Sequence, residues 1–131
     1  KPFDILLIED SREDSTLLTI LFEQIPIINK VVVKHSKGEG LEHLKSKGHD
    51  FGLIICDYIT FEGEKFEREL LQEAKKYNIP FMYLSGINSP LSSAKAFSDG
   101  AIAFLEKPLD HRQFLAVISS LDRMGIELVR I

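Results

Sequence analysis

Residues 51–57 read FGLIICD, an apolar run that ends in an aspartate. The run lacks the polar alternation of a strand with one face in water, so it predicts a strand that is covered on both faces. Four further runs of the same character occupy residues 3–8, 31–33, 80–84 and 101–105. Short strands of this kind favour a parallel sheet that lies between layers of helices.

Segments with helical spacing separate these runs. Ser11 with Asp14 resembles a capping box at the start of the first segment, Asp110 with Gln113 could cap the last, and a second helix is expected around residues 41–44. The alternation predicts an α/β fold, a doubly wound five-stranded parallel sheet with five helices on both faces. The apolar residues expected to line one face of the first, third and last helices are Leu17, Leu18, Leu21, Phe22 and Ile25; Phe66, Leu70, Ala74 and Tyr77; and Phe114, Ile118 and Leu121.

The composition indicates a single folded domain, residues 1–131. Hydrophobic residues make up 44% and charged residues 27%, which are ordinary globular values. The formal net charge of -4 argues against nucleic acid as a partner, because a phosphate backbone is held mainly by clustered Lys and Arg. Cys56 is the only cysteine, so a reducing, cytoplasmic location is expected. No apolar stretch approaches the ~20 residues that span a bilayer, so no membrane contact is expected.

Side chains that can carry chemistry follow four of the predicted strands. Glu9 and Asp10 follow the first strand, Asp57 the third, Ser85 the fourth and Lys107 the fifth. Ligands of open parallel sheets bind beyond the carboxyl ends of the strands. We therefore expect these five side chains to converge on one edge of the sheet.

Their convergence would suit phosphoryl transfer. Three carboxylates at one edge repel one another unless a hard cation neutralises them, and Mg²⁺ fits because it prefers oxygen ligands. Lys107 would place a positive charge beside a bound phosphoryl group, and the Ser85 hydroxyl could donate to another phosphoryl oxygen. Because positioning and electrostatic stabilisation carry most of this reaction, the set predicts that Asp57 accepts a phosphoryl group.

Four motifs resemble those of the receiver domains of two-component response regulators. They are residues 5–10 (ILLIED), 53–57 (LIICD), 81–86 (FMYLSG) and 100–108 (GAIAFLEKP). The resemblance covers nearly the whole chain, and the motifs together are highly specific. It implies the flavodoxin-like strand order 2-1-3-4-5.

The resemblance also implies a metal site and a phosphodonor. Asp57 would receive phosphate from a histidine kinase or a histidine phosphotransfer protein, in a reaction that needs Mg²⁺. Glu9, Asp10 and Asp57 would hold the metal together with the backbone carbonyl of Ile59. The chain would then be a signalling phosphoacceptor rather than an enzyme, assisting only its own phosphorylation and dephosphorylation.

A switch is implied in the same way. Ser85 matches the hydroxyl of the family that moves toward the phosphate, and Phe104 matches the aromatic that turns inward when it does. Lys107 matches the family's lysine. Residues 90–125 resemble the usual output face, which comprises the fourth helix, the fifth strand and the fifth helix. Nothing in the chain names the output partner.

Other functions stay open. Residues 57–63, DYITFEG, lack the Met-Pro pair that family members usually carry in this loop, which leaves room for an unphosphorylated pseudo-receiver that only binds proteins. A flavodoxin-like mononucleotide binder shares the architecture, but the anionic residues 9–14, EDSRED, would repel a flavin phosphate. Haloacid-dehalogenase-like phosphatases carry a second Asp two residues after the nucleophile, where this chain has Ile59. Residues 126–131, IELVRI, are expected to form an added strand, the start of a linker or a dimer contact.

Overall fold

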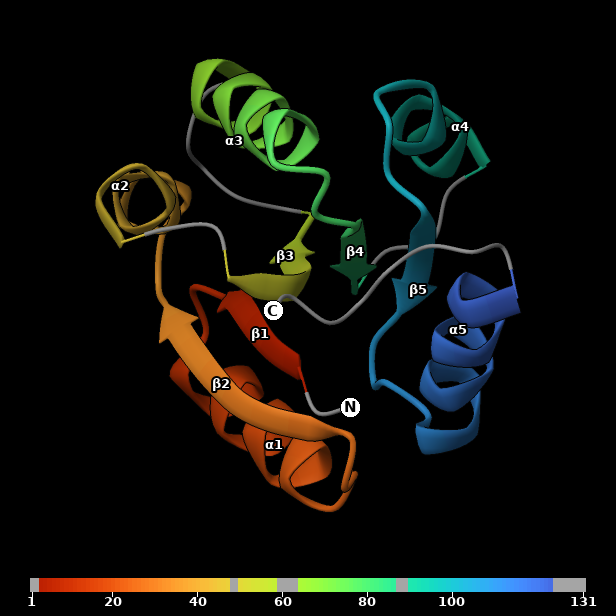
Figure 1. Ribbon diagram of the computed structural model, residues 1–131. Coiled ribbons are helices and arrows are strands. Elements are labelled where there is room, and N and C mark those ends of the chain that lie inside the picture. The colour runs from red at the N-terminus through yellow and green to blue at the C-terminus, as the bar shows by residue number, and fades with distance from the viewer. Residues whose placement is uncertain (1–2, 48–49, 59–63, 87–89, 124–131) are drawn as a thin grey trace.

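The computed structural model describes residues 3–47, 50–58, 64–86 and 90–123. Within them, five parallel strands form one sheet in the order β2-β1-β3-β4-β5, which confirms the predicted architecture. Figure 1 shows α1 and α5 on one face of the sheet and α2, α3 and α4 on the other. In these ranges, every helix is too short or too polar to cross a bilayer. The elements are β1 (Phe3–Ile8), α1 (Arg12–Glu23), β2 (Ile28–Lys34), α2 (Lys37–Lys47), β3 (Phe51–Asp57), α3 (Glu64–Lys76), β4 (Phe81–Ser85), α4 (Pro90–Ser98), β5 (Ala103–Glu106) and α5 (His111–Arg123).

The strands are bounded nearly as predicted, with one larger difference at the edge of the sheet. β1 begins and ends where the apolar run does, whereas β2 begins three residues before residues 31–33 and ends one residue after them. Its first residue, Ile28, pairs with Phe3, and its exposed residues Asn29 and Lys30 lie within the strand. Polar residues are tolerated here because β2 is an edge strand, so pairing with β1 rather than hydrophobicity sets its length.

Side chains of the inner strands alternate between two cores, one on each face of the sheet. Ile5 and Leu7 of β1 join the core beneath α1 and α5, whereas Leu6 and Ile8 join the core beneath α2, α3 and α4. All seven residues of β3 are buried, as expected for the central strand.

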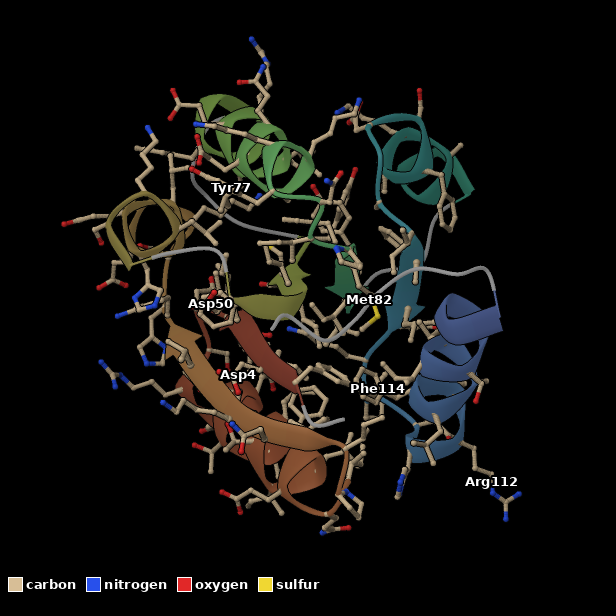
Figure 2. All side chains as sticks on the ribbon, in the orientation of Figure 1. Asp4, Asp50, Tyr77, Met82, Arg112 and Phe114 are labelled. Carbon is tan, nitrogen blue, oxygen red and sulfur yellow. The ribbon has the colours of Figure 1, made fainter. Side chains whose placement is uncertain are left out.

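Most of the predicted helix faces lie against the sheet. Figure 2 shows Phe114 extending from α5 toward the sheet, while Arg112 of the same helix points away. Two predictions were wrong, because Leu17 is 66% exposed and Phe66 is 38% exposed. Each helical residue is rotated by about 100° from its neighbour, so burying Leu18 turns Leu17 outward. The side chain of Leu121 lies outside the described part of the chain. The predicted residues confirmed as buried are Leu18, Phe22, Ile25, Leu70, Ala74, Phe114 and Ile118.

The predicted helix caps are present, and the cap of α1 is hydrogen-bonded to Glu9 at the end of β1. The Ser11 hydroxyl accepts a hydrogen bond from the backbone N–H of Asp14 at 3.1 Å, which caps α1. The Asp14 carboxylate does not return this bond, because the Ser11 N–H donates to Glu9 at 3.2 Å instead. Asp110 caps α5, accepting two backbone N–H groups at 2.7 and 3.4 Å.

A lysine lies inside the core beneath α2, α3 and α4. The Lys37 side chain is 2% exposed, and its ammonium lies 3.7 Å from a carboxylate oxygen of Glu67 on α3. The other oxygen of Glu67 accepts a hydrogen bond from the hydroxyl of Tyr83 on β4. Burial of a charge is tolerated only with such partners, so this network joins α2, α3 and the sheet.

Gly40 allows α2 to lie close against β1. A Cβ atom at this position would meet Cδ1 of Ile8 at 2.5 Å and Cγ1 at 2.8 Å. Ile8 is 1% exposed, so its side chain has little room to move. Only a glycine fits this approach of the helix without repacking.

We expect Gly40→Ala to destabilise the protein by about 1 kcal/mol, because overpacking costs about 1–3 kcal/mol and the gain in helix propensity returns about 1 kcal/mol. The free energy of unfolding is measured by urea titration. Ile8→Val removes the closer contact atom, so the double variant should be less destabilised than the sum of the two single variants. A single Gly40→Ala variant more stable than the parent would contradict the close approach.

Candidate functional site

The predicted site residues meet at one edge of the sheet. Asp57 and Ser85 end β3 and β4, Glu9 follows β1 directly, and Lys107 follows β5 directly. The strands are parallel, so these four positions share the carboxyl edge. The backbone N–H of Lys107 donates to the carbonyl of Ser85 at 2.8 Å, which continues the ladder beyond β5 and fixes where the lysine side chain starts.

Three carboxylates gather there. Glu9, Asp10 and Asp57 each offer an oxygen atom, and these atoms all lie within 4.8 Å of one another. Glu9 is 1% exposed and Asp57 is 6% exposed, while Asp10 is exposed to solvent. The structure therefore brings the three predicted acidic residues together, two of them buried and one at the surface.

The Lys107 ammonium lies among these carboxylates. Its Nζ atom is 2.6 Å from Glu9 Oε1 and 3.3 Å from Asp57 Oδ1. A further carboxylate reaches it from α1, with Asp14 Oδ2 at 3.0 Å. One side chain thus links β1, β3 and α1 at the site.

The cluster carries more negative charge than Lys107 neutralises. Burial raises the pKa of Asp57 to about 7, the negative charge of Glu9 adds to this shift, and Lys107 opposes it. Burial also raises the pKa of Glu9. Burial lowers the pKa of Lys107, but its contacts with Glu9 and Asp14 outweigh this and hold the pKa above its ordinary value. The negative charge of Glu9 thus adds to the cost of ionising Asp57, and a further cation beside the two carboxylates would reduce this cost.

The side chains suit a divalent metal ion. All the ligand atoms that the cluster offers are carboxylate oxygens, the donors that hard cations prefer. In the described part of the chain, Glu9 Oε1 is the one buried side-chain oxygen without a hydrogen-bond partner. The Lys107 ammonium approaches this oxygen as an ion pair outside hydrogen-bond geometry. The cluster could therefore hold a metal. Ile59, whose carbonyl was predicted as a further ligand, lies outside the described residues.

The two predicted switch residues lie on β4 and β5, the strands next to β3 on the side away from β1. Ser85 is fully buried at the end of β4. Phe104 packs on the core beneath α2, α3 and α4, with its ring 5.1 Å from that of Tyr58 and 6.3 Å from that of Tyr83. Tyr58 directly follows Asp57, so the aromatic cluster begins next to the carboxylates.

Sequence reasoning missed two residues of the site. Asp14 was assigned only to the helix cap, yet its carboxylate contacts Lys107. It lies in the first turn of α1, four residues after Asp10, and this closeness in the sequence to the acidic pair was the available signal. His35 follows β2, and its Nδ1 donates to the backbone carbonyl of Glu9 at 3.0 Å. The position of His35 directly after a strand was the feature of the sequence that could have predicted this contact.

Comparison with known proteins agrees with the fold of the chain. No protein-family model matches the chain. A response regulator receiver domain protein from Clostridium thermocellum superposes with a TM-score of 0.78 at 21% identity, over 94% of this chain and 97% of that one. The chain therefore has the receiver-domain fold, as its motifs predict.

Two curated relatives are similar in sequence. The CAI-1 autoinducer sensor kinase/phosphatase CqsS of Vibrio cholerae is 28% identical over 88% of this chain and 17% of that protein. The transcriptional regulatory protein ZraR of Klebsiella oxytoca is 28% identical over 88% of this chain and 25% of that protein. The chain spans a quarter or less of the length of either relative.

We expect Asp57→Asn to make the cation-free protein about 1–3 kcal/mol more stable, because burial and the charge of Glu9 both disfavour an ionised side chain at this position. Urea titration in the presence of a chelator measures the free energy of unfolding. Asp50→Asn is the matched control, since Asp50 is exposed and precedes β3 at the opposite end of that strand. Equal stability of Asp57→Asn and the parent would show that Lys107 already compensates the charge.

Proposed function

We propose that this receiver-fold chain accepts a phosphoryl group on Asp57 from a phosphohistidine of a histidine kinase or phosphotransfer protein. The observation that carries the proposal is the position of Asp57. Its carboxylate ends the central strand, lies 3.3 Å from the Lys107 ammonium and shares an oxygen cluster with Glu9 and Asp10. The names of the two relatives, a sensor kinase/phosphatase and a transcriptional regulator, support a role in signalling.

The Asp57 carboxylate is the nucleophile of the proposed reaction. One of its oxygens forms a bond to phosphorus while the bond between phosphorus and the donor's imidazole nitrogen breaks. The imidazole leaves with the electron pair of that bond, and the phosphoryl group ends as an acyl phosphate on Asp57. Such a transfer needs alignment and charge stabilisation rather than further covalent chemistry. In this sense the chain assists its own modification and turns over no other substrate.

Lys107 and Ser85 stabilise the transferred group. The ammonium of Lys107 already lies beside Asp57 and can donate to a phosphoryl oxygen with little movement. The hydroxyl of Ser85, at the end of the neighbouring strand β4, provides a neutral donor for a second oxygen. Both side chains start from strand ends, so the sheet sets their spacing.

Mg²⁺ is the metal we assign to the acidic cluster. Glu9, Asp10 and Asp57 would hold it, with the backbone carbonyl of Ile59 as a further ligand by family resemblance. When bound, the ion supplies positive charge to carboxylates and phosphoryl oxygens that would otherwise repel one another. The buried oxygen Oε1 of Glu9, which pairs with Lys107 but accepts no hydrogen bond, supports this assignment.

The proposed output surface is formed by α4, β5 and α5. Phe104 lies on β5, which belongs to this surface, and packs on Tyr58, the residue after Asp57. Phosphorylation would act on the surface through Ser85 and Phe104. The partner on this surface is a protein or a domain that the chain itself does not identify.

The proposal predicts that a small phosphodonor with Mg²⁺ adds one phosphoryl group to the parent protein and none to Asp57→Asn. Intact-mass spectrometry measures the addition. Asp50→Asn, which removes an exposed aspartate at the other end of β3, should be labelled like the parent. An Asp57→Asn variant labelled as readily as the parent would overturn the assignment. A parent that is never labelled would favour a protein-binding module.

The metal assignment predicts that Mg²⁺ raises the melting temperature, because the ion binds the folded cluster and not the unfolded chain. At a Mg²⁺ concentration of about one hundred times Kd, the gain is about 2.7 kcal/mol. The Glu9→Gln, Asp10→Asn double variant should lose this gain.

The matched control for the metal is the Glu42→Gln, Asp50→Asn double variant, which removes two exposed charges outside the cluster. It should keep the Mg²⁺ effect. Scanning calorimetry with and without Mg²⁺ measures all three proteins. A full Mg²⁺ effect in the Glu9, Asp10 variant would place the ion elsewhere.

A further inference from the structure

Lys107 is surrounded by three carboxylates before any phosphoryl group arrives. Glu9, Asp14 and Asp57 lie 2.6, 3.0 and 3.3 Å from its Nζ atom. An ammonium group has three N–H donors. The contact with Asp14 is a hydrogen bond, whereas those with Glu9 and Asp57 are ion pairs. A phosphoryl oxygen that takes the bound N–H of Lys107 must therefore displace Asp14.

The three partners differ in how readily they can release the lysine. The side chains of Glu9 and Asp57 are 1% and 7% exposed, so releasing Lys107 would leave a buried charge without compensation. The Asp14 side chain is 42% exposed, and water can replace its contact at little cost. Of the three, Asp14 is the partner that can yield.

The position of Asp14 does not depend on its carboxylate. Its backbone N–H is held by the Ser11 hydroxyl, which fixes the first turn of α1. The carboxylate is left to contact Lys107, at 3.0 Å in hydrogen-bond geometry. Removing its charge would therefore change the contact with Lys107 and leave the helix cap in place.

We propose that Asp14 is a positioning residue that binds Lys107 before phosphoryl transfer and competes with the phosphoryl oxygens for it. This inference rests on the proposed phosphorylation of Asp57 and adds a residue that limits its rate. Lys107 must leave Asp14 as charge develops on the transferring group. Asp14 thus stabilises the unphosphorylated state relative to the transition state.

Asp14→Asn should speed the transfer, because Glu9 and Asp57 still hold Lys107 over the site while the competing charge is gone. An exposed ion pair of this kind contributes modestly, so we expect the maximal phosphorylation rate to rise about two- to fivefold. The donor concentration at half-maximal rate should stay unchanged, because the interaction acts during transfer and not during donor binding. The rates are measured by mass spectrometry at several donor concentrations in Mg²⁺.

Glu13→Gln is the matched control. Glu13 is the neighbouring acidic residue in the first turn of α1, it is exposed, and no ion pair joins it to a described residue. If Asp14 acted only by repelling an anionic donor, both variants would lower the half-maximal donor concentration, and the effect would fade with added salt. Asp14→Glu keeps the charge and should restore a rate close to that of the parent.

A second readout needs neither donor nor metal. The ammonium protons of Lys107 exchange slowly with water while they are bound to carboxylates, so ¹⁵N NMR should detect them in the parent. Exchange should be faster in Asp14→Asn and unchanged in Glu13→Gln. This measurement reports the contact itself, independently of phosphorylation.

The outcomes separate this inference from the proposed function. A parent that is never labelled on Asp57 overturns the proposed function and the inference with it. Labelling of the parent and Asp14→Asn at equal maximal rates overturns the inference alone. Equal ammonium exchange in these two proteins also overturns it, because Asp14 would then not hold Lys107 in solution.

Discussion

The ion contacts of Lys107 are the interaction on which the acidic edge of the sheet depends. Parallel strands bring their carboxyl ends together, and here that geometry places Glu9 and Asp57 side by side in a buried position. Two buried carboxylates repel each other and lose their hydration. The Lys107 ammonium, 2.6 Å from Glu9 and 3.3 Å from Asp57, compensates part of this negative charge. The pairing of β4 with β5 positions Lys107, because the backbone N–H of Lys107 donates to the backbone carbonyl of Ser85.

The other side of the cluster is held by β2 and the start of α2. The backbone N–H of Glu9 donates to the carbonyl of Lys34 at 2.9 Å, and its carbonyl accepts from Nδ1 of His35 at 3.0 Å. The backbone N–H of His35 in turn donates to Glu39, which belongs to the first turn of α2. Gly40, in the same turn, lets the helix approach Ile8 just before Glu9. The acidic edge of the sheet is thus braced by elements that contribute no carboxylate to the cluster of Glu9, Asp10 and Asp57.

Aromatic rings connect Asp57 to the core beneath α2, α3 and α4. Tyr58, the next residue, packs edge-on against Tyr83 and Phe104, with ring centroids 5.1 Å away in each case. The hydroxyl of Tyr83 is bound by Glu67 of α3, which also pairs with the buried Lys37. Close packing of the rings and hydrogen bonding of the buried polar groups favour a single conformation of these side chains. The surroundings of Phe104 are therefore set by α2 and α3 as well as by the site.

The pattern of residues along the chain was enough to predict the α/β fold and the residues at the strand ends. Uninterrupted apolar runs identify buried parallel strands, and chain order then assigns residues such as Asp57 and Lys107 to one edge. Contacts in three dimensions were needed to show that Leu17 faces solvent, that Gly40 is needed against β1, and that Asp14 binds Lys107. The periodic spacing of apolar residues predicts whether a segment forms a helix or a strand. The rotation of a helix and the partner of a charge depend on contacts between residues far apart in the chain, as between Asp14 and Lys107, and no local pattern encodes them.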